Sequence, residues 1–226
     1  KLARLAADRG KDHGAALTWF TAALGECAQR IDICDELEAS ASASEPGAWS
    51  SVEEAYTEAR EVLEGDGERD AEWMDISLRL GRLYKDQLSD DGQALAVFDD
   101  VLGRDDTNAT ALDAKDTIFT RLSDWNSLLE VLEIKTLAAS TDAGRGELYA
   151  RASGIHEQHG GDLEAAIEGY REILTIDPAH EGALSALHRL YKQTGDASAL
   201  AEILGTLIDL HEGDVGPRRE YQLALA

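Results

Sequence analysis

Apolar residues recur along nearly the whole chain at intervals of three and four, which is the spacing of one face of an α-helix. Residues 163–191, LEAAIEGYREILTIDPAHEGALSALHRLY, show this pattern twice, with one Asp-Pro step between two apolar stripes. Proline interrupts a helix, because it lacks a backbone N–H and its ring clashes with the preceding turn. The pattern therefore predicts that one helix ends at the step from Asp177 to Pro178 and that a second helix begins directly after it.

The apolar pattern also repeats over a longer distance. The shift that places Leu83 on Ile155 (155 − 83 = 72) superposes nine apolar positions and one expected helix N-cap. A fainter copy lies upstream, with Leu5 on Leu83 (83 − 5 = 78), and its extra residues fall in the loop-like stretches SASASEPGAW and EGDGERD. The matching pairs are Leu83 and Ile155, Ala94 and Ala166, Leu95 and Ile167, Phe98 and Tyr170, Leu102 and Leu174, Leu112 and Leu184, Phe119 and Tyr191, Asp124 and Asp196, Leu128 and Leu200, and Leu132 and Leu204.

The spacing within each half of this repeat resembles the tetratricopeptide repeat, a helix–turn–helix unit of about 34 residues. Residues 181–214 carry apolar side chains at positions 4, 7, 11, 20, 24 and 27 of such a unit. Small residues at positions 8 and 20 allow two paired helices to approach, and an aromatic residue at position 24 fills the space beside the next unit. Residues 74–108 resemble the motif more closely, with Leu80, Gly81, Tyr84, Ala94 and Phe98 matching its positions 7, 8, 11, 20 and 24.

The resemblance implies an all-α fold, a right-handed α-solenoid of stacked antiparallel helix hairpins. We expect residues 1–226 to form one such solenoid, similar to long bacterial arrays of this family with a 72-residue super-repeat. Both ends of the sequence look as if they lie inside a longer array, so we expect a fragment. The expected units are approximately residues 1–30, 31–73 (degenerate, with long loops), 74–108, 109–145, 146–180, 181–216 and 217–226 (the start of a further helix).

The charge narrows the classes of partner. The chain carries 21 Lys and Arg against 45 Asp and Glu, a formal net charge of −24. Such a field repels nucleic acid and anionic lipid, and the apolar windows are too short for a membrane span. We expect a soluble protein without membrane insertion. The sequence does not fix the compartment and favours the cytoplasm only slightly.

Cys27 and Cys34 lie seven residues apart on an expected helix, about 10 Å along its axis, which is too far for a disulfide.

The sequence offers few candidates for chemistry. His156 and His159 lack the further ligands of a zinc site, and the acidic pairs near turns lack the spacing of a calcium loop. Phosphate-binding loops and nucleophile motifs do not occur. We therefore predict a non-enzymatic protein with no catalytic residues, no metal and no cofactor. Trp19, Trp49, Trp73 and Trp125 are expected to pack in the core or at junctions between repeats.

The family resemblance implies a binding face. In this family the first helix of each hairpin lines a concave groove, with positions 2, 5, 6, 9, 12 and 13 facing inward. Over four units these positions hold seven basic and five acidic residues. The predicted groove therefore carries a formal charge of +2, and the rest of the chain carries −26. Our hypothesis is that this groove binds an acidic or carboxylate-ended segment of a partner protein; alternatively, the basic side chains pair with acidic neighbours. The basic positions are Arg79, Arg82, Lys85, Arg121, Arg151, Arg189 and Lys192.

Two further interpretations remain open at this point. The chain is predicted to be a protein-interaction scaffold, but it can also be a regulatory or targeting arm of a larger multidomain enzyme whose catalytic domain lies outside these residues. A small-molecule sensor is a third interpretation, and it would require a deep apolar pocket where the inner positions are mostly polar or small. Self-association through the ends of the repeat array is also compatible with the sequence.

Overall fold

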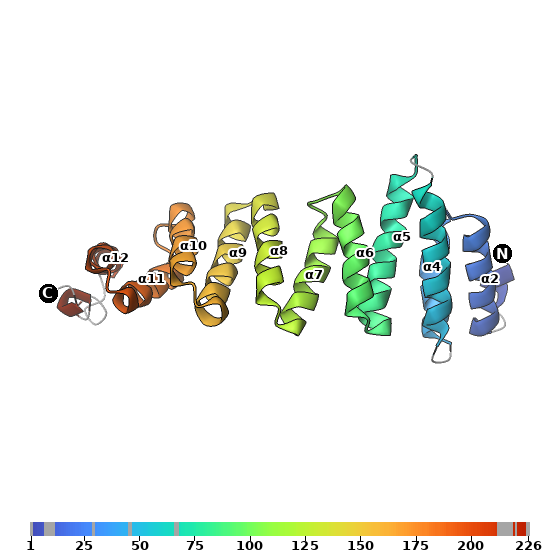
Figure 1. Cartoon of the computed structure of the whole chain (residues 1–226), viewed down its shortest axis with the longest axis horizontal. Helices are drawn as coiled ribbons and strands as arrows, with labels where there is room; N and C mark the ends of the chain where they lie inside the picture. Colours follow the sequence, from blue (N-terminus) through green and yellow to red (C-terminus); the bar gives the residue numbers. More distant parts are fainter. Residues whose placement is uncertain are drawn as a thin grey trace. The chain divides into compact units, whose positions relative to one another are not determined.

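The computed structural model consists of paired helices (Figure 1). Every regular element in the described part of the chain is helical, so the all-α prediction is confirmed. The chain divides into two compact units, residues 1–118 and 119–226, with α7 running from one into the other. The structure describes residues 2–6, 12–28, 30–44, 47–65, 68–211, 219 and 221–224.

The first unit is a run of helices in which chain neighbours pack against one another. Contacts join α2 with α3 and α4, α4 with α5, and α5 with α6. Its buried core is continuous and includes the first part of α7. The elements are α1 (Leu2–Leu5), α2 (His13–Glu26), a 3-10 turn (Ile31–Ile33), α3 (Cys34–Ser42), α4 (Ala48–Glu64), α5 (Asp70–Leu83), α6 (Asp91–Arg104) and α7 (Ala109–Leu122).

The second unit is built in the same way. Contacts join α8 with α9, α9 with α10, α10 with α11, and α11 with α12. Of the further helix expected at residues 217–226, residues 221–224 are helical, whereas residues 217, 218, 220, 225 and 226 lie outside the described residues. The elements are α8 (Trp125–Ala138), α9 (Asp142–Ile155), α10 (Leu163–Ile176), α11 (Glu181–Thr194) and α12 (Ala197–Leu210).

These helices alternate between two roles. We call α3, α5, α7, α9 and α11 first helices, and α2, α4, α6, α8, α10 and α12 second helices, following the positions of the repeat. All of the second helices except α4 begin with an aspartate whose carboxylate accepts the backbone N–H three residues later. This contact satisfies an N–H group that has no partner inside the helix, so it fixes where the helix begins. The capping residues are Asp12, Asp90, Asp124, Asp162 and Asp196.

The predicted joint at Pro178 is confirmed. Helix α10 ends at Ile176, and the N–H of Asp177 donates to the carbonyl of Ile173 at 2.8 Å. Helix α11 then begins at Glu181, where the ring of His180 accepts the N–H of Ala183 at 3.1 Å. The short turn leaves the two helices in contact.

Helix bounds recur at the interval found in the sequence. Helices α5, α6, α7 and α8 precede α9, α10, α11 and α12 by that same interval, as the starts at Asp70 and Asp142 illustrate (142 − 70 = 72). Similarity to long bacterial arrays with a super-repeat stays a prediction, as do the handedness and the unit boundaries.

One local feature was not predicted. After α5 and α9 the chain forms a π-turn (Tyr84–Leu88 and His156–Gly160), closed by the N–H of Ser89 to the carbonyl of Tyr84 and by the N–H of Gly161 to that of His156. The aspartate that follows donates to the same carbonyl, Asp90 to Tyr84 and Asp162 to His156. Each bond spans six residues, whereas the equivalent bond from Asp196 to Tyr191 after α11 spans five. Residues 74–108 and 146–180 each number 35, so the π-turn holds the one residue that exceeds the 34-residue motif.

Small residues set the distance between paired helices. Gly81 of α5 faces Phe98 of α6, and a Cβ atom at Gly81 would lie 2.6 Å from Cε1 of that ring. The ring is fully buried, so it has little room to move. In the second unit, Gly169 of α10 meets Ser153 of α9 with similarly little space.

Trp73 is buried as expected, but the expectation is wrong for Trp19, which is 51% exposed.

We expect Gly81→Ala to lower the free energy of unfolding by about 1–2 kcal/mol, because overpacking against Phe98 outweighs the gain in helix propensity of about 1 kcal/mol. Gly103→Ala on α6 is the matched control, since no atom lies within 4 Å of a Cβ built there. That variant is expected to be neutral or stabilised by up to about 1 kcal/mol. Urea denaturation of both variants measures the difference, and a Gly81→Ala protein as stable as the control would contradict the packing argument.

Candidate interaction surface

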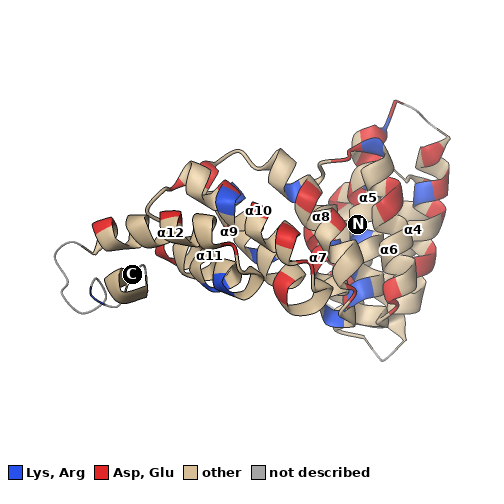
Figure 2. Cartoon of the chain, turned by 60° about the vertical axis from the view of Figure 1, so that its left-hand side comes forward, with Lys and Arg blue, Asp and Glu red and all other residues tan. Residues whose placement is uncertain are grey.

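Arg79 lies at the centre of a charged cluster on the first helices of the first unit. Its Nε donates to Asp75 at 2.8 Å on its own helix α5. Its Nη1 donates to Glu38 at 2.9 Å and lies 2.8 Å from a carboxylate oxygen of Asp35, both on α3. Only 16% of the arginine side chain is exposed. Acidic positions are frequent on the helices around this cluster (Figure 2).

The cluster continues into the core through a tyrosine. The hydroxyl of Tyr56 on α4 donates to Glu38 at 2.7 Å, and the tyrosine is fully buried. Burial, together with the neighbouring Cys34 and Glu38, raises the pKa of Tyr56 far above its usual value. Burial likewise raises the pKa of Cys34 to about 11. Both groups therefore stay neutral at physiological pH, which is consistent with a structural role and leaves Cys34 unreactive.

Arg79 is held as a cation by its carboxylate partners. Burial lowers its pKa, but the hydrogen bonds to Asp75, Glu38 and Asp35 outweigh this effect and raise the pKa above its usual value. A guanidinium engaged in this way has few donors left for a ligand. Arg79 thus ties α3 to α5.

A small cavity lies beside this cluster. Its volume is about 170 Å³. Of the two arginines that line it, Arg79 and Arg82, Arg82 is the more exposed. The Nε of Arg82 donates to the carbonyl of Leu78 on the same helix at 3.2 Å. Among the described residues, Arg82 has no carboxylate partner. The Nζ of Lys85, about one turn further along the chain, lies 3.3 Å from Oδ1 of Asp86. The lining residues are Glu38, Trp49, Arg79, Arg82, Leu83, Asp86 and Gln87.

The remaining predicted residues lie in the second unit. The Nη2 of Arg151 on α9 donates to the hydroxyl of Thr120 at 2.9 Å. Arg189 on α11 forms a two-pronged ion pair with Glu157. Lys192 is exposed on α11, without a carboxylate partner among the described residues, and Arg121 is exposed near the end of α7. The structure thus brings carboxylates to Arg79, Lys85 and Arg189.

The histidines identified in the sequence take packing positions. His159 stacks on Trp125, with ring centroids 4.0 Å apart and an angle of 10° between the ring planes. His156 lies in the π-turn after α9. Within the described residues, no group of three or more His, Cys, Asp or Glu side chains is arranged to hold a metal ion. Among the helices of that part of the chain, none combines the length and apolar character that crossing a membrane requires.

The paired helices, with small residues at their closest approach, define the class of fold: an array of helix hairpins of the tetratricopeptide type. No family model and no curated protein matches the sequence. A tetratricopeptide repeat protein from Parabacteroides merdae is similar in structure, with 16% identity and a TM-score of 0.47 over 91% of this chain and 73% of that one. A MamA protein structure is similar with 19% identity and a TM-score of 0.45, over 87% of this chain and 95% of its own. PilW, a type IV pilus biogenesis factor, is similar with 16% identity and a TM-score of 0.40, over 98% and 95%.

We expect Arg79→Met to lower the free energy of unfolding by about 1–2 kcal/mol, because it leaves Glu38 and Asp75 without their cation in a half-buried setting. Arg82→Met on the same helix is the matched control and is expected to change stability by less than about 0.5 kcal/mol. Chemical denaturation at neutral pH compares the two. Equal effects of the two substitutions would show that the Arg79 cluster does not hold α3 to α5.

Proposed function

We propose that this chain is a non-enzymatic scaffold that binds a segment of a partner protein along its first helices, with Arg82 as the contact for a carboxylate of that segment. The observation that carries the proposal is the cavity beside α5. It combines an arginine that has no acidic partner among the described residues with the side chains of Trp49 and Leu83.

The chemistry of the cavity suits an acidic group next to an apolar one. A guanidinium binds a carboxylate through two parallel hydrogen bonds, and arginine is preferred where such planar recognition matters. Trp49 and Leu83 offer apolar surface for a neighbouring side chain. The two carboxylates in the lining are already engaged, since Glu38 accepts hydrogen bonds from Arg79 and Tyr56, and Asp86 pairs with Lys85. They therefore repel an incoming carboxylate less than free acids would.

The architecture supports a binding role as well. Stacked hairpins present an extended surface built from consecutive helices, which accommodates a stretch of polypeptide better than a compact ligand. The basic residues of this surface that are paired, such as Arg79 and Arg189, serve the fold instead of the partner in this proposal. The proposed acidic specificity therefore depends chiefly on Arg82, with Lys192 as a second candidate, in the second unit.

The proposal is tested by titrating the full chain with short fluorescent peptides that end in Asp-Leu or, as the uncharged match, in Asn-Leu. Each peptide is used with a free and with an amidated C-terminus. We expect binding of the acidic peptide that weakens with salt and falls about tenfold or more in Arg82→Gln, as loss of a charge-assisted hydrogen bond of about 1.5 kcal/mol implies.

Arg145→Gln is the matched control, because it removes the same charge from an exposed arginine at the start of α9. Equal weakening by both substitutions would mean that the peptide senses only the general field of the protein. Peptides that bind equally well with Asp and Asn and with either C-terminus would contradict the proposed acidic specificity.

A further inference from the structure

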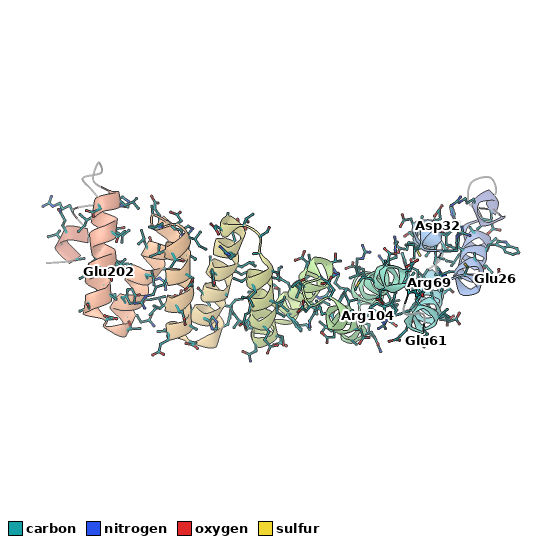
Figure 3. The ribbon with its side chains drawn as sticks, turned by 90° about the horizontal axis from the view of Figure 1, so that it is seen from above. Glu26, Asp32, Glu61, Arg69, Arg104 and Glu202 are labelled. Carbon is teal, nitrogen blue, oxygen red and sulfur yellow. The ribbon has the colours of Figure 1, made fainter. Side chains whose placement is uncertain are left out.

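The chain itself shows what fills the space between two successive second helices. Between α4 and α6, Arg60 reaches across from α4 and forms an ion pair with Asp100 on α6. Arg104 of α6 binds Asp70 at the start of α5 at 2.8 Å, and its Nη2 lies 3.9 Å from a carboxylate oxygen of Glu64 at the end of α4. Both guanidinium groups lie over the buried ring of Trp73, with their Cζ atoms 5.0 and 3.5 Å from its centroid. Arginine side chains therefore connect α4 with α6 here; Arg104 is labelled in Figure 3.

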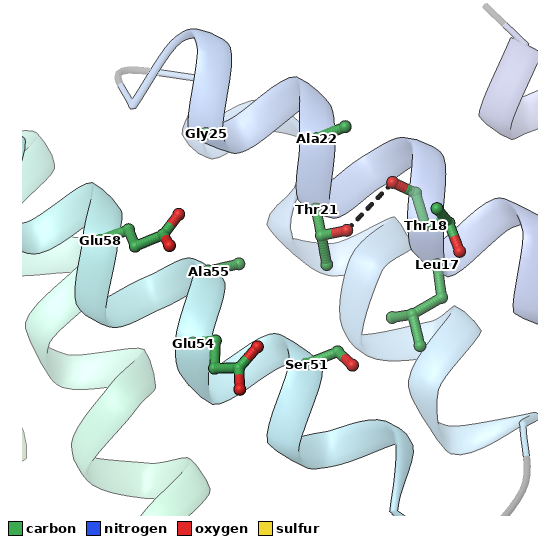
Figure 4. Close-up of a pocket in the computed structure, with 9 residues that line it drawn as sticks. All are labelled: Leu17, Thr18, Thr21, Ala22, Gly25, Ser51, Glu54, Ala55 and Glu58. Carbon is green, nitrogen blue, oxygen red and sulfur yellow. Dashed lines mark hydrogen bonds between the residues drawn. The ribbon is translucent and has the colours of Figure 1, made fainter.

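Between α2 and α4, which are in contact, no arginine lies and a groove remains on the surface of the described residues. It forms a cavity of about 430 Å³ (Figure 4). One wall consists of Leu17 and several small residues on α2, and the other carries Glu54 and Glu58 from α4. Neither glutamate has a hydrogen bond or an ion pair within the described part of the chain, and both are exposed. The lining residues are Leu17, Thr18, Thr21, Ala22, Gly25, Ser51, Glu54, Ala55 and Glu58.

The two gaps correspond in register. Tyr56 of α4 and Phe98 of α6 are both fully buried at equivalent points of their helices. Glu58 and Asp100 each follow two residues later, so Glu58 is the counterpart of the carboxylate that Arg60 binds. The difference lies on the opposite wall of each gap.

Arg60 follows Tyr56 by four residues, whereas the residue four after Phe20 on α2 is Leu24, which is fully buried. The first gap therefore has the acceptor but lacks an arginine at the position that supplies one in the second gap. A Cβ atom at Gly25 would lie 3.9 Å from a carboxylate oxygen of Glu58, which is ordinary van der Waals contact, so this carboxylate faces α2 across the groove at a point where α2 has no side chain.

We propose that the groove between α2 and α4 binds an arginine-bearing segment of a partner protein. The partner's guanidinium lies against Glu58 and Glu54, as Arg60 lies against Asp100. Spacing of four residues puts the two glutamates on one face of α4, where a single guanidinium can reach both. Small residues on α2 let the partner backbone come close. This groove is formed by second helices, so it is separate from the Arg82 cavity on the first helices.

The test uses isotope-labelled full chain and a short alanine- and glutamine-based peptide that carries one arginine, with citrulline in place of arginine in the matched peptide. Citrulline keeps the shape of arginine and removes its charge. We expect the arginine peptide to shift the amide NMR signals of Thr21, Ala22, Gly25 and the glutamates, and the citrulline peptide to leave them unchanged. Glu54→Gln with Glu58→Gln is expected to weaken binding about tenfold, since charged hydrogen bonds to both carboxylates are lost.

The control is the double variant Glu26→Gln with Glu61→Gln. These glutamates lie on the same two helices as Glu54, Glu58 and the opposite wall; they are exposed and do not line the groove (Figure 3). Their substitution removes the same charge as the Glu54 and Glu58 substitutions. Equal weakening by both double variants would overturn the proposal in favour of a general attraction to the acidic surface. Signal shifts confined to residues outside the groove would overturn it as well.

A groove-filling variant separates binding from folding. Gly25→Arg places a guanidinium on α2 in front of Glu58, near the end of the helix where a cation is favourable. We expect this variant to keep or raise the melting temperature and to lose binding of the arginine peptide. A stable Gly25→Arg protein that binds the peptide as well as the wild type would contradict the proposed site.

Discussion

Close approach of two helices through a small residue is the constraint on which the rest of this structure depends. Where Gly81 meets the ring of Phe98, α5 and α6 come near enough to bury the ring completely. In α9 and α10 the small residues Ser153 and Gly169 face each other at a similarly close approach. Because each helix packs mainly on its neighbours along the chain, stability accumulates from such local interfaces instead of from one central core.

The acidic surface follows from this architecture. An array of hairpins has much surface for its length, and the net charge of −24 has to be accommodated there. Arginines in the first unit lie between carboxylates and offset part of this charge: Arg79 between α3 and α5, Arg60 between α4 and α6, and Arg104 between α6 and α5. Binding is proposed where this pairing is incomplete within the described ranges, at Arg82, which has no carboxylate partner there, and at Glu54 and Glu58, which have no basic partner there.

The sequence predicted the features that depend on short-range patterns. Apolar periodicity located the helices, and local chemistry located the joint at Pro178 and the cap at Asp196. It did not predict the π-turns, because one added residue at a helix end leaves the apolar stripe unchanged. It also could not choose which of the neighbouring apolar residues Trp19 and Phe20 faces the core. The carboxylate partners of Arg79 on α3 lie far away in the sequence, so pairing required the tertiary structure.

The central claim is that the size of the residue at the closest approach sets the spacing of each helix pair. A double-mutant cycle of Gly81→Ala and Phe98→Leu tests it most directly, because a smaller side chain at residue 98 makes room for the added methyl group. The account predicts that the double variant is more stable than the sum of the two single effects implies, by about 1 kcal/mol or more. Effects that add to within about 0.3–0.5 kcal/mol would show that the two residues do not set the spacing together.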